Sequence, residues 1–591
     1  MTSENTTQEH TPDKASLSSL SLHSEAFEAI ELEDQATLSN SHNEEDQTQI
    51  ERALSRKSTK LEDKLGQVHD NILPMKQLIV CFLSLSCSLF VSFCDQSSVA
   101  IALPLIAKDL NAADSINWAG TASLLANTVC QVLYGRLSDI YGRKNILLVS
   151  IVILLVANLL CGFAKSGPEF YVFRALAGIG AGGIQSLTMV IASDSVTLRE
   201  RGKYQGILGT SVGMGNIVGP LVMAALTEKS TWRDFYRIFP GIIALTFVIV
   251  CIFVKGNQSK QLNSVLTPRQ KLMKIDYGGM FLSCAGLVLL LVPLSGGGST
   301  FRWDSTLVIV MFVVGGLCIV AFAIYELKVP ELPMIPLTAM KSATLTILLI
   351  SNFLFGAGYF GFFYVIPYYF QIVRGYSPMR SAVLLIPMLT VQSFMSTVAG
   401  TLMSITGHYI YIIAFGYSIW LTGLCVTLKW GTDSSIGLIT GTLIMIGTGA
   451  GFIFQPSIVA IQANCKKSQR AVIIGFRNVL RSFGGAFGIA VSSLVISNTL
   501  NNSINKEMST GFLPQSFLLN MKSHVFSHPD YSGFSPQQIL HVKQMYMHSI
   551  RDSSYFLIPL LALSLLTCVV IRDNGLHCID EPKEEKKEGQ V

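Results

Sequence analysis

Apolar runs of roughly 20 residues follow one another almost without a break between Lys76 and Arg572. At about 1.5 Å of rise per residue, a helix of this length matches the roughly 30 Å hydrocarbon core of a bilayer. A helix also pairs its own backbone polar groups, so it can cross lipid without leaving them unsatisfied. The runs are more numerous than one buried globular core could use. They predict an all-α protein that crosses a membrane many times.

The composition agrees with a membrane protein and argues against several other classes. Apolar side chains make up 50% of the 591 residues and charged ones 14%, whereas about 25% would be charged in an ordinary soluble protein. The net charge of +5 forms no basic patch interleaved with aromatics, so no nucleic-acid partner is expected. The 12 cysteines lie mostly inside apolar runs, without CxxC or zinc-type spacing. They predict packing, with no metal site and no cofactor.

The apolar runs predict fourteen transmembrane helices. These cover about 78–104, 117–136, 146–165, 168–193, 204–226, 237–254, 277–295, 306–325, 343–370, 380–403, 409–428, 435–462, 472–497 and 553–572. The basic turns are those after even-numbered spans, beginning with Arg136, Arg143 and Lys144. Because basic loops remain in the cytosol, these turns and both chain termini are expected there.

Three segments outside the spans have their own character. Residues 1–74 are rich in Ser, Thr, Glu, Asp and Gln and predict a disordered cytosolic tail without a signal peptide. Residues 573–591 predict a second cytosolic tail. Residues 498–553 predict a long non-cytosolic loop with several prolines as helix breakers. This loop contains the sequon Asn501-Asn502-Ser503, a predicted N-glycosylation site at Asn501.

The turn after the second span carries a specific motif. Its sequence is GRLSDIYGRK, from Gly135 to Lys144. The glycines Gly135 and Gly142 permit a tight turn and close helix approach, while Asp139 at a helix end can exchange basic partners such as Arg143. The stretch resembles the G-x-L-x-D-x-x-G-R-K/R signature of the major facilitator superfamily, which implies a conformational gate. A plain cytosolic turn with basic residues is the alternative.

Two further motifs support the same resemblance. RALAGIGAGG, which starts at Arg174, is similar to the family's R-x-x-Q-G-x-G, with Ala177 in the place of Gln. This similarity implies a part for Arg174 in proton coupling, with snorkelling to the interface as the alternative. The fifth span resembles the antiporter pattern G-x8-G-x3-G-P, although ordinary small-residue helix packing explains it too. Its residues are Gly206, Gly215, Gly219 and Pro220.

Asp95 is the ionisable residue most expected to carry function. It lies in FCDQSSVAIALP within the first span, which is similar to a stretch of fourteen-span drug and amino-acid exporters. A carboxylate there suits reversible protonation or a cationic substrate, and a static salt bridge is the alternative. Gln455 is expected to line the cavity or to bond a neighbouring helix. Asp194 is expected at a cytosolic gate or in a helix-end ion pair.

Two arginines of the thirteenth span, Arg477 and Arg481, lie four residues apart. Because their span begins shortly before them, we expect them near its cytosolic end, in contact with anionic lipid or a gate.

The resemblance extends from about Leu78 to Arg572 and is closest to the fungal fourteen-span branch, which contains multidrug/proton antiporters and vacuolar basic amino-acid transporters. It implies a six-helix half in 75–255, a cytosolic loop and two extra helices in 256–330, and a second six-helix half in 331–572. Alternating access around a midplane site between the halves would follow.

The predicted function is proton-coupled secondary transport of small solutes, most specifically of basic amino acids into the vacuole. No Walker A sequence is present to use ATP, and no nucleophile–base pair or metal cluster suggests an enzyme. The first alternative is a multidrug/proton antiporter of the plasma membrane, which carries amphiphilic drugs; residence in the endoplasmic reticulum is also open. The second is a nutrient sensor that transports little. The expected partners are substrate, protons and the lipid bilayer, and the protein is expected to be a monomer.

Overall fold

The computed structural model describes residues 74–112, 118–254, 276–296, 303–328, 342–466, 469–508, 511–523 and 531–571, with a few single positions beside these ranges. The N-terminal tail, the loop before 276 and the end of the C-terminal tail lie outside the described residues, so the predictions made for them are not addressed by the structure.

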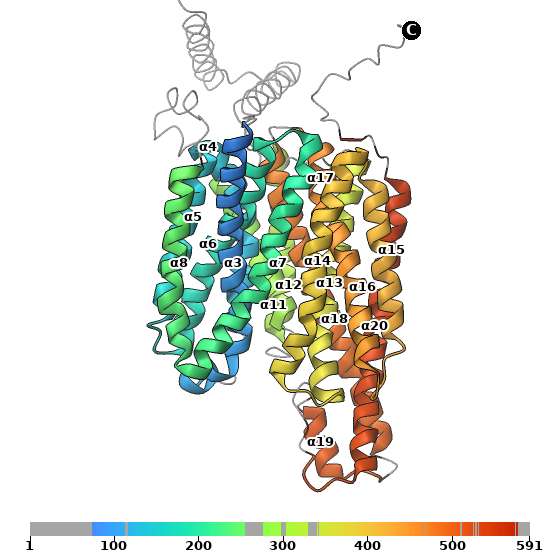
Figure 1. The fold of residues 1–591 in the computed structure, drawn as a ribbon. Helices are drawn as coiled ribbons and strands as arrows, with labels where there is room; N and C mark the ends of the chain where they lie inside the picture. The colour runs from blue at the N-terminus through green and yellow to red at the C-terminus, as the bar shows by residue number, and fades with distance from the viewer. Residues whose placement is uncertain are drawn as a thin grey trace, which may run out of the picture.

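Long helices account for nearly all of the described chain (Figure 1). They are α3 (Met75–Asp109), α4 (Trp118–Tyr141), α5 (Arg143–Cys161), α6 (Gly167–Ser195), α7 (Leu198–Lys229), α8 (Trp232–Phe253), α11 (Tyr277–Gly296), α12 (Thr306–Lys328), α13 (Ala343–Tyr368) with a π-helical turn η2 (Tyr369–Val373), α14 (Pro378–Thr406), α15 (Ile410–Thr427), α16 (Ile436–Phe454), α17 (Pro456–Ala463), α18 (Arg470–Glu507), α19 (Gln515–Ser523) and α20 (Pro536–Val570).

Within the described residues, 13 helical segments are long and apolar enough to cross a membrane. The segments of α16 and α17 count as one of them. α4 is not among the 13, since polar residues such as Asn127, Gln131 and Asp139 interrupt its apolar sequence. It nevertheless lies among the spans, packed against α6 and α18. With α4 included, the described helices correspond to the fourteen predicted from the sequence.

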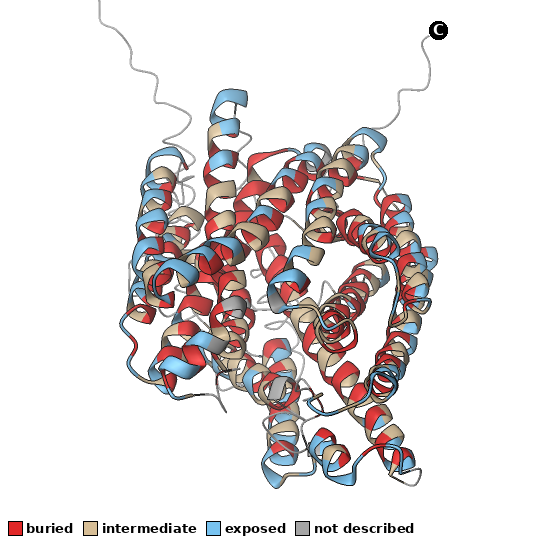
Figure 2. Ribbon diagram, turned by 60° about the horizontal axis from the view of Figure 1, so that its bottom comes forward, coloured by how far each residue is buried: buried red, intermediate tan, exposed pale blue. Residues whose placement is uncertain are grey.

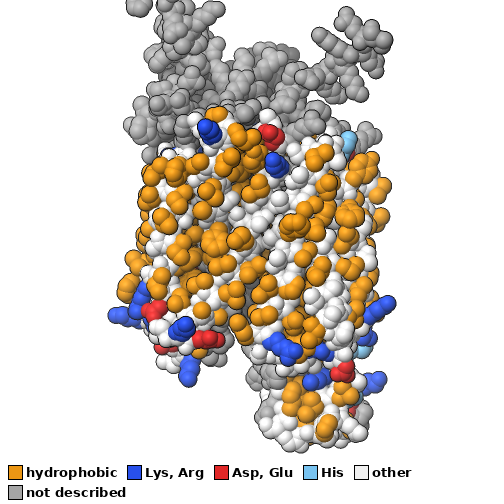
Figure 3. Space-filling view, viewed as in Figure 1, with side chains coloured by type: hydrophobic (Ala, Val, Ile, Leu, Met, Phe, Trp, Pro, Cys, Tyr) orange, Lys and Arg blue, Asp and Glu red, His pale blue; other side chains and the backbone are white. Residues whose placement is uncertain are grey.

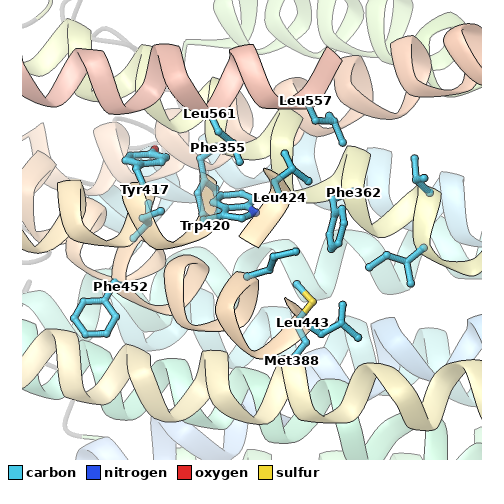
Figure 4. Packing of buried hydrophobic residues seen from close by; sticks show 14 of the residues in the cluster. Phe355, Phe362, Met388, Tyr417, Trp420, Leu424, Leu443, Phe452, Leu557 and Leu561 are labelled. Atoms are coloured by element: carbon cyan, nitrogen blue, oxygen red, sulfur yellow. The ribbon is translucent and has the colours of Figure 1, made fainter. Parts of the chain in front are cut away.

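The helices form two bundles. α3 to α8 surround one hydrophobic cluster and α13 to α20 surround another. Figure 2 shows buried faces turned inward in both bundles and exposed faces around the circumference. The second core is rich in rings: Trp420, Phe355 and Tyr417 pack with Leu561 of α20 (Figure 4). α11 and α12 pack on each other, and α11 contacts α4 and α18.

Two helix pairs join the bundles, α7 with α14 and α4 with α18. Glycines make both contacts close. The backbones of Gly202 and Gly400 meet with no room for a methyl group, and a side chain at Gly206 would reach within 2.8 Å of Thr397 Cα. A side chain at Gly135 would lie 3.1 Å from the carbonyl oxygen of Ala471. We call the end where α3 begins and α20 finishes the upper end, as drawn in Figure 1; most of these contacts lie toward it.

The surface carries a broad apolar belt with charged residues gathered near its two rims (Figure 3). Side chains such as Phe281, Leu317 and Val569 are more than half exposed on the helices of this belt. Exposed apolar area of this extent is unfavourable in water but suits contact with acyl chains. Figure 3 also shows a notch between the bundles at the lower end.

The segment 498–553, predicted as a long loop with prolines as helix breakers, is mostly helical where the structure describes it. α18 continues to Glu507, α19 follows, and α20 already begins at Pro536. Proline is tolerated in the first turn of a helix because its missing N–H would have no partner there. Ser535 and Gln538 form a capping box at this start. Pro536 therefore starts a helix instead of breaking one.

Candidate functional site

The first candidate residues, Asp95 and Arg174, form an ion pair inside the first bundle. Arg174 Nη1 of α6 donates to Asp95 Oδ1 of α3 at 2.9 Å, and each side chain is 1% exposed. Cys161 of α5 and Tyr236 of α8 interact electrostatically with Arg174. The other carboxylate oxygen, Asp95 Oδ2, is buried without a hydrogen-bond partner. Since the pair is enclosed among four helices of one bundle, it does not line the space between the bundles.

The residues predicted to form a gate come together at the upper end. Arg143 Nη1 lies 2.9 Å from Asp194 Oδ2, and Arg143 Nη2 donates to Asp139 Oδ1 at 3.3 Å. Arg470, at the start of α18 in the other bundle, interacts electrostatically with Asp194. The turn that presents Arg143 contains Gly142 at φ 90°, a conformation that favours glycine. The arrangement links α4, α5 and α6 and reaches across to the second bundle.

The glycines of the α7 motif contact two different neighbours. Gly206 lies against α14, in the other bundle. Gly215 and Gly219 lie against α3, where a side chain at Gly215 would come within 2.7 Å of the Phe90 carbonyl oxygen. Pro220 follows inside the helix. α7 therefore has one close-packed face within its own bundle and one between the bundles.

A pocket lies between the bundles about halfway along α7. Its empty volume, open solvent included, is about 300 Å³. It is lined by Gly209, Val212, Gly213, Asn216, Leu389, Gln392, Ser393, Ser396 and Phe454. None of these lining residues carries a charge.

Gln455, predicted to line the cavity, lies beside this pocket. A side chain at Gly209 would reach within 3.1 Å of Gln455 Nε2. The Gln455 side chain is fully buried, yet its Oε1 and Nε2 have no hydrogen-bond partner. Within the pocket, Gln392 Oε1 accepts a hydrogen bond from the Tyr359 hydroxyl at 2.9 Å.

Two arginines that sequence reasoning assigned to lipid or a gate lie beside the pocket. Arg477 is 1% exposed and donates to Asn352 Oδ1 at 2.7 Å and to Ser457 Oγ at 2.9 Å, among other neutral acceptors. The Arg481 guanidinium lies 4.9 Å from the centre of the Phe454 ring, which lines the pocket. Both point into protein, so the expected lipid contact is wrong.

The expected lipid contact of Arg477 and Arg481 was wrong because the two residues lie deep along α18. At about 1.5 Å per residue, the 11 residues from Arg470 to Arg481 correspond to roughly 17 Å, more than half of a bilayer core. The polar face shared by Arg477, Asn478 and Arg481 was the available signal, because a cation this deep requires internal partners.

The remaining predictions concern chemistry at single positions. Asn501 lies half-buried in α18, near the end of that helix, and its glycosylation stays a prediction. Among the described residues, no group of three or more His, Cys, Asp or Glu could hold a metal ion.

Two bundles that meet around a pocket, inside an apolar belt, form the architecture of a multi-pass membrane transporter. The family model of the Major Facilitator Superfamily matches residues 85–489, and the chain belongs to this family. It is therefore a transporter and not an enzyme, as the sequence predicted.

Relatives of the chain carry transporter names. It is 40% identical to Citrate exporter 1 of Yarrowia lipolytica, over 88% of this chain and 76% of the relative. It is 28% identical to the Multidrug transporter protein MdtP of Bacillus subtilis, over 81% of this chain and 86% of the relative. The structure resembles that of the proton:xylose symporter XylE, with a TM-score of 0.56 over 86% of this chain and 98% of that one. At 11% identity, this last similarity shows the fold alone.

Proposed function

We propose that the protein is a proton-driven secondary transporter that moves a small solute out of the cytosol by alternating access. The observation that carries this proposal is the asymmetry of the space between the bundles. The upper end is closed by the glycine contacts of α7 with α14 and of α4 with α18. The lower end shows a notch. A pocket lies between the two ends.

The orientation of this asymmetry follows from the charges in the turns. The basic turns lie at the upper end, which makes that end cytosolic by the positive-inside rule. The conformation is then closed to the cytosol. Asp139, Arg143 and Asp194, with Arg470 of the other bundle, would act as the latch that opens when the halves 75–255 and 331–572 rock apart.

Proton coupling is assigned to the pair of Asp95 and Arg174. Protonation of Asp95 would remove the charge that holds Arg174 and would leave that arginine to find another partner. A change of this kind inside the first bundle gives the proton a way to alter helix packing. The free oxygen Asp95 Oδ2 is the position at which the proton would be held.

Export through the plasma membrane and loading of the vacuole both move solute away from the cytosol, and we retain the vacuolar membrane as the proposed location. The sequence favoured basic amino acids as cargo and drugs as the alternative. Similarity to a citrate exporter adds an organic acid to these classes. The choice among them depends on the charge of the groups around the pocket.

Transport can be tested with the purified full-length protein in proteoliposomes that carry a pH gradient. Labelled citrate, lysine and an amphiphilic drug are offered one at a time, and flux is compared before and after the gradient is collapsed. We expect one class to accumulate only while the gradient persists. Asp194→Asn should weaken the latch and slow this flux. Binding of a solute without gradient-dependent flux would contradict the proposal and favour a nutrient sensor.

A further inference from the structure

The two arginines of α18 differ in how their charges are met. Arg477 is held by four neutral acceptors: Asn352 Oδ1, Asn478 Oδ1, Ser457 Oγ and the Phe454 carbonyl oxygen. Arg481, one turn further along the helix, has neither an ion pair nor a side-chain hydrogen bond with any described residue. Its contacts are the Phe454 ring and an electrostatic interaction with Tyr359. The N–H groups of the Arg481 guanidinium are therefore available to a ligand.

Phe454 and Tyr359 connect Arg481 to the pocket. Phe454 lines the pocket and carries the Arg481 guanidinium over its ring. Tyr359 donates to Gln392 Oε1, and Gln392 also lines the pocket. Because its oxygen is engaged, Gln392 presents its amide N–H groups elsewhere. The hydrogen bond from Tyr359 thus leaves the amide nitrogen of this lining residue as the group free to donate to a ligand.

A second free amide completes the set of donors. Gln455 is fully buried beside Gly209, and neither its nitrogen nor its oxygen has a partner. A buried amide without a hydrogen bond has lost its contacts with water and gained none in return, which is unfavourable. A ligand that accepts from Gln455 would recover this cost. No carboxylate is among the lining residues that would compete for these donors.

We propose that Arg481, Gln392 and Gln455 form a binding site for the carboxylate group of a small organic acid. This inference rests on the proposed function, since it assigns the cargo class of the same pocket. The planar guanidinium fork matches a carboxylate with two parallel hydrogen bonds. The amides supply further donors without adding charge.

The same features argue against a cationic cargo. A basic amino acid also carries a carboxylate, but it would bring its positive ammonium groups close to Arg481, where no described acid offsets the charge. Asp95 does not serve this purpose, because it is paired with Arg174 inside the first bundle. Phosphate shares the bidentate geometry with carboxylate, so the test must separate these two anions.

The test measures binding and flux with the full-length protein in lipid nanodiscs and in proteoliposomes. The probes are citrate, succinate, phosphate and lysine at equal ionic strength. Wild-type protein should bind citrate or succinate in preference to phosphate and lysine. Arg481→Gln should weaken carboxylate binding roughly tenfold to hundredfold, the amount expected for a lost charged hydrogen bond. Arg481→Lys should retain part of the binding.

Gln455→Met provides a second variant whose result does not depend on Arg481. It removes an unpartnered buried amide, so it should raise the thermal stability of the protein while weakening carboxylate binding severalfold. A residue with a purely structural role would not separate these two readouts in this way. Arg380→Gln is the matched control, because Arg380 lies exposed near the start of α14, far from the pocket.

The outcomes separate this inference from the proposed function. Preferred binding of phosphate or lysine, or carboxylate binding unchanged in Arg481→Gln, overturns the carboxylate site. Gradient-dependent flux of lysine that is unchanged in Arg481→Gln would also overturn the carboxylate site, but it would leave the proposed transport function intact. Carboxylate binding that depends on Arg481, without flux of any probe, would leave the site in place and overturn the transport function.

Discussion

The two bundles each bury an arginine but compensate its charge by different means. In the first bundle, Arg174 lies 2.9 Å from the carboxylate of Asp95, and the pair is neutral as a whole. In the second bundle, Arg477 is surrounded by amide, hydroxyl and carbonyl oxygens and keeps its positive charge. The first arrangement changes only when a proton or a new partner breaks the pair. The second leaves a positive field, which Arg481 extends toward the pocket.

This difference suggests a division of labour within the proposed cycle. The neutral pair in the first bundle suits a proton, because protonation of Asp95 would change the net charge of the pair from zero to +1. The uncompensated arginines of the second bundle suit an anion, since an incoming carboxylate supplies the missing charge. Exchange of an organic acid for protons would then act on two separate sets of residues. Each set can be altered without touching the other.

The largest expected effect comes from breaking the pair in the first bundle. Asp95→Asn leaves the charge of Arg174 buried and unpaired, which costs roughly 3–5 kcal/mol in comparable cases. We therefore expect a clear loss of stability, measured as unfolding of the purified protein in detergent, in addition to loss of gradient-driven flux. The double variant Asp95→Asn with Arg174→Gln should recover much of the stability but not the flux. If Asp95→Asn were as stable as wild type, Asp95 would not be compensating the charge of Arg174, and the two bundles would not differ in this respect.

A smaller effect is expected in the second bundle. Arg477→Met removes the donor to several neutral acceptors without stranding a charge, at a cost of roughly 1–3 kcal/mol. Arg481→Met is the matched control on the same helix. Because Arg481 has no side-chain hydrogen bond to any described residue, its replacement should hardly change the unfolding temperature. If both variants were equally destabilised, Arg481 would be as structural as Arg477, and the distinction between them would fail.

The sequence predicted the transmembrane helices well because their signal is local. A run of apolar residues reports a span by itself. Asp139 and Arg143 of the motif from Gly135 to Lys144 are near neighbours in sequence, and they lie in contact. α20 shows the limit of this reasoning. Its first 17 residues, from Pro536 onward, extend beyond the predicted span, and polar residues outside the bilayer give no apolar run to detect.

The sites were harder to predict because they depend on which helices face each other. Asp95 and Arg174 were expected to act on the same proton, but across a sequence separation of 79 residues the sequence did not define their direct ion pair. Gln455 was expected at a cavity and lies beside one. Arg481 was misplaced, since the direction of a side chain within a bundle follows from helix rotation, which the apolar pattern of a nearly uniform span does not define.

An exposed ion pair completes the comparison and should have the smallest effect. Asp109, beyond the apolar part of α3, pairs with Arg233 at the start of α8 and accepts from Trp232 Nε1 at 3.1 Å. The hydrogen bond from Arg233 lowers the pKa of Asp109 below its ordinary value of 3.8. Since 47% of the carboxylate side chain is exposed, solvent screening limits the pair to about 0.2–1 kcal/mol.

The lowered pKa fixes how this small contribution depends on pH. The stabilisation is complete above pH 3.8 and is lost as the pH falls through the lowered pKa of the folded state. Asp109→Asn should therefore be slightly less stable than wild type at neutral pH, and the difference should vanish in strong acid. Glu228→Gln, an exposed acid at the same end of the molecule, should show no difference at either pH. A cost for Asp109→Asn as large as that for Asp95→Asn would mean that burial does not set the value of these pairs, and the contrast between the two bundles would lose its physical basis.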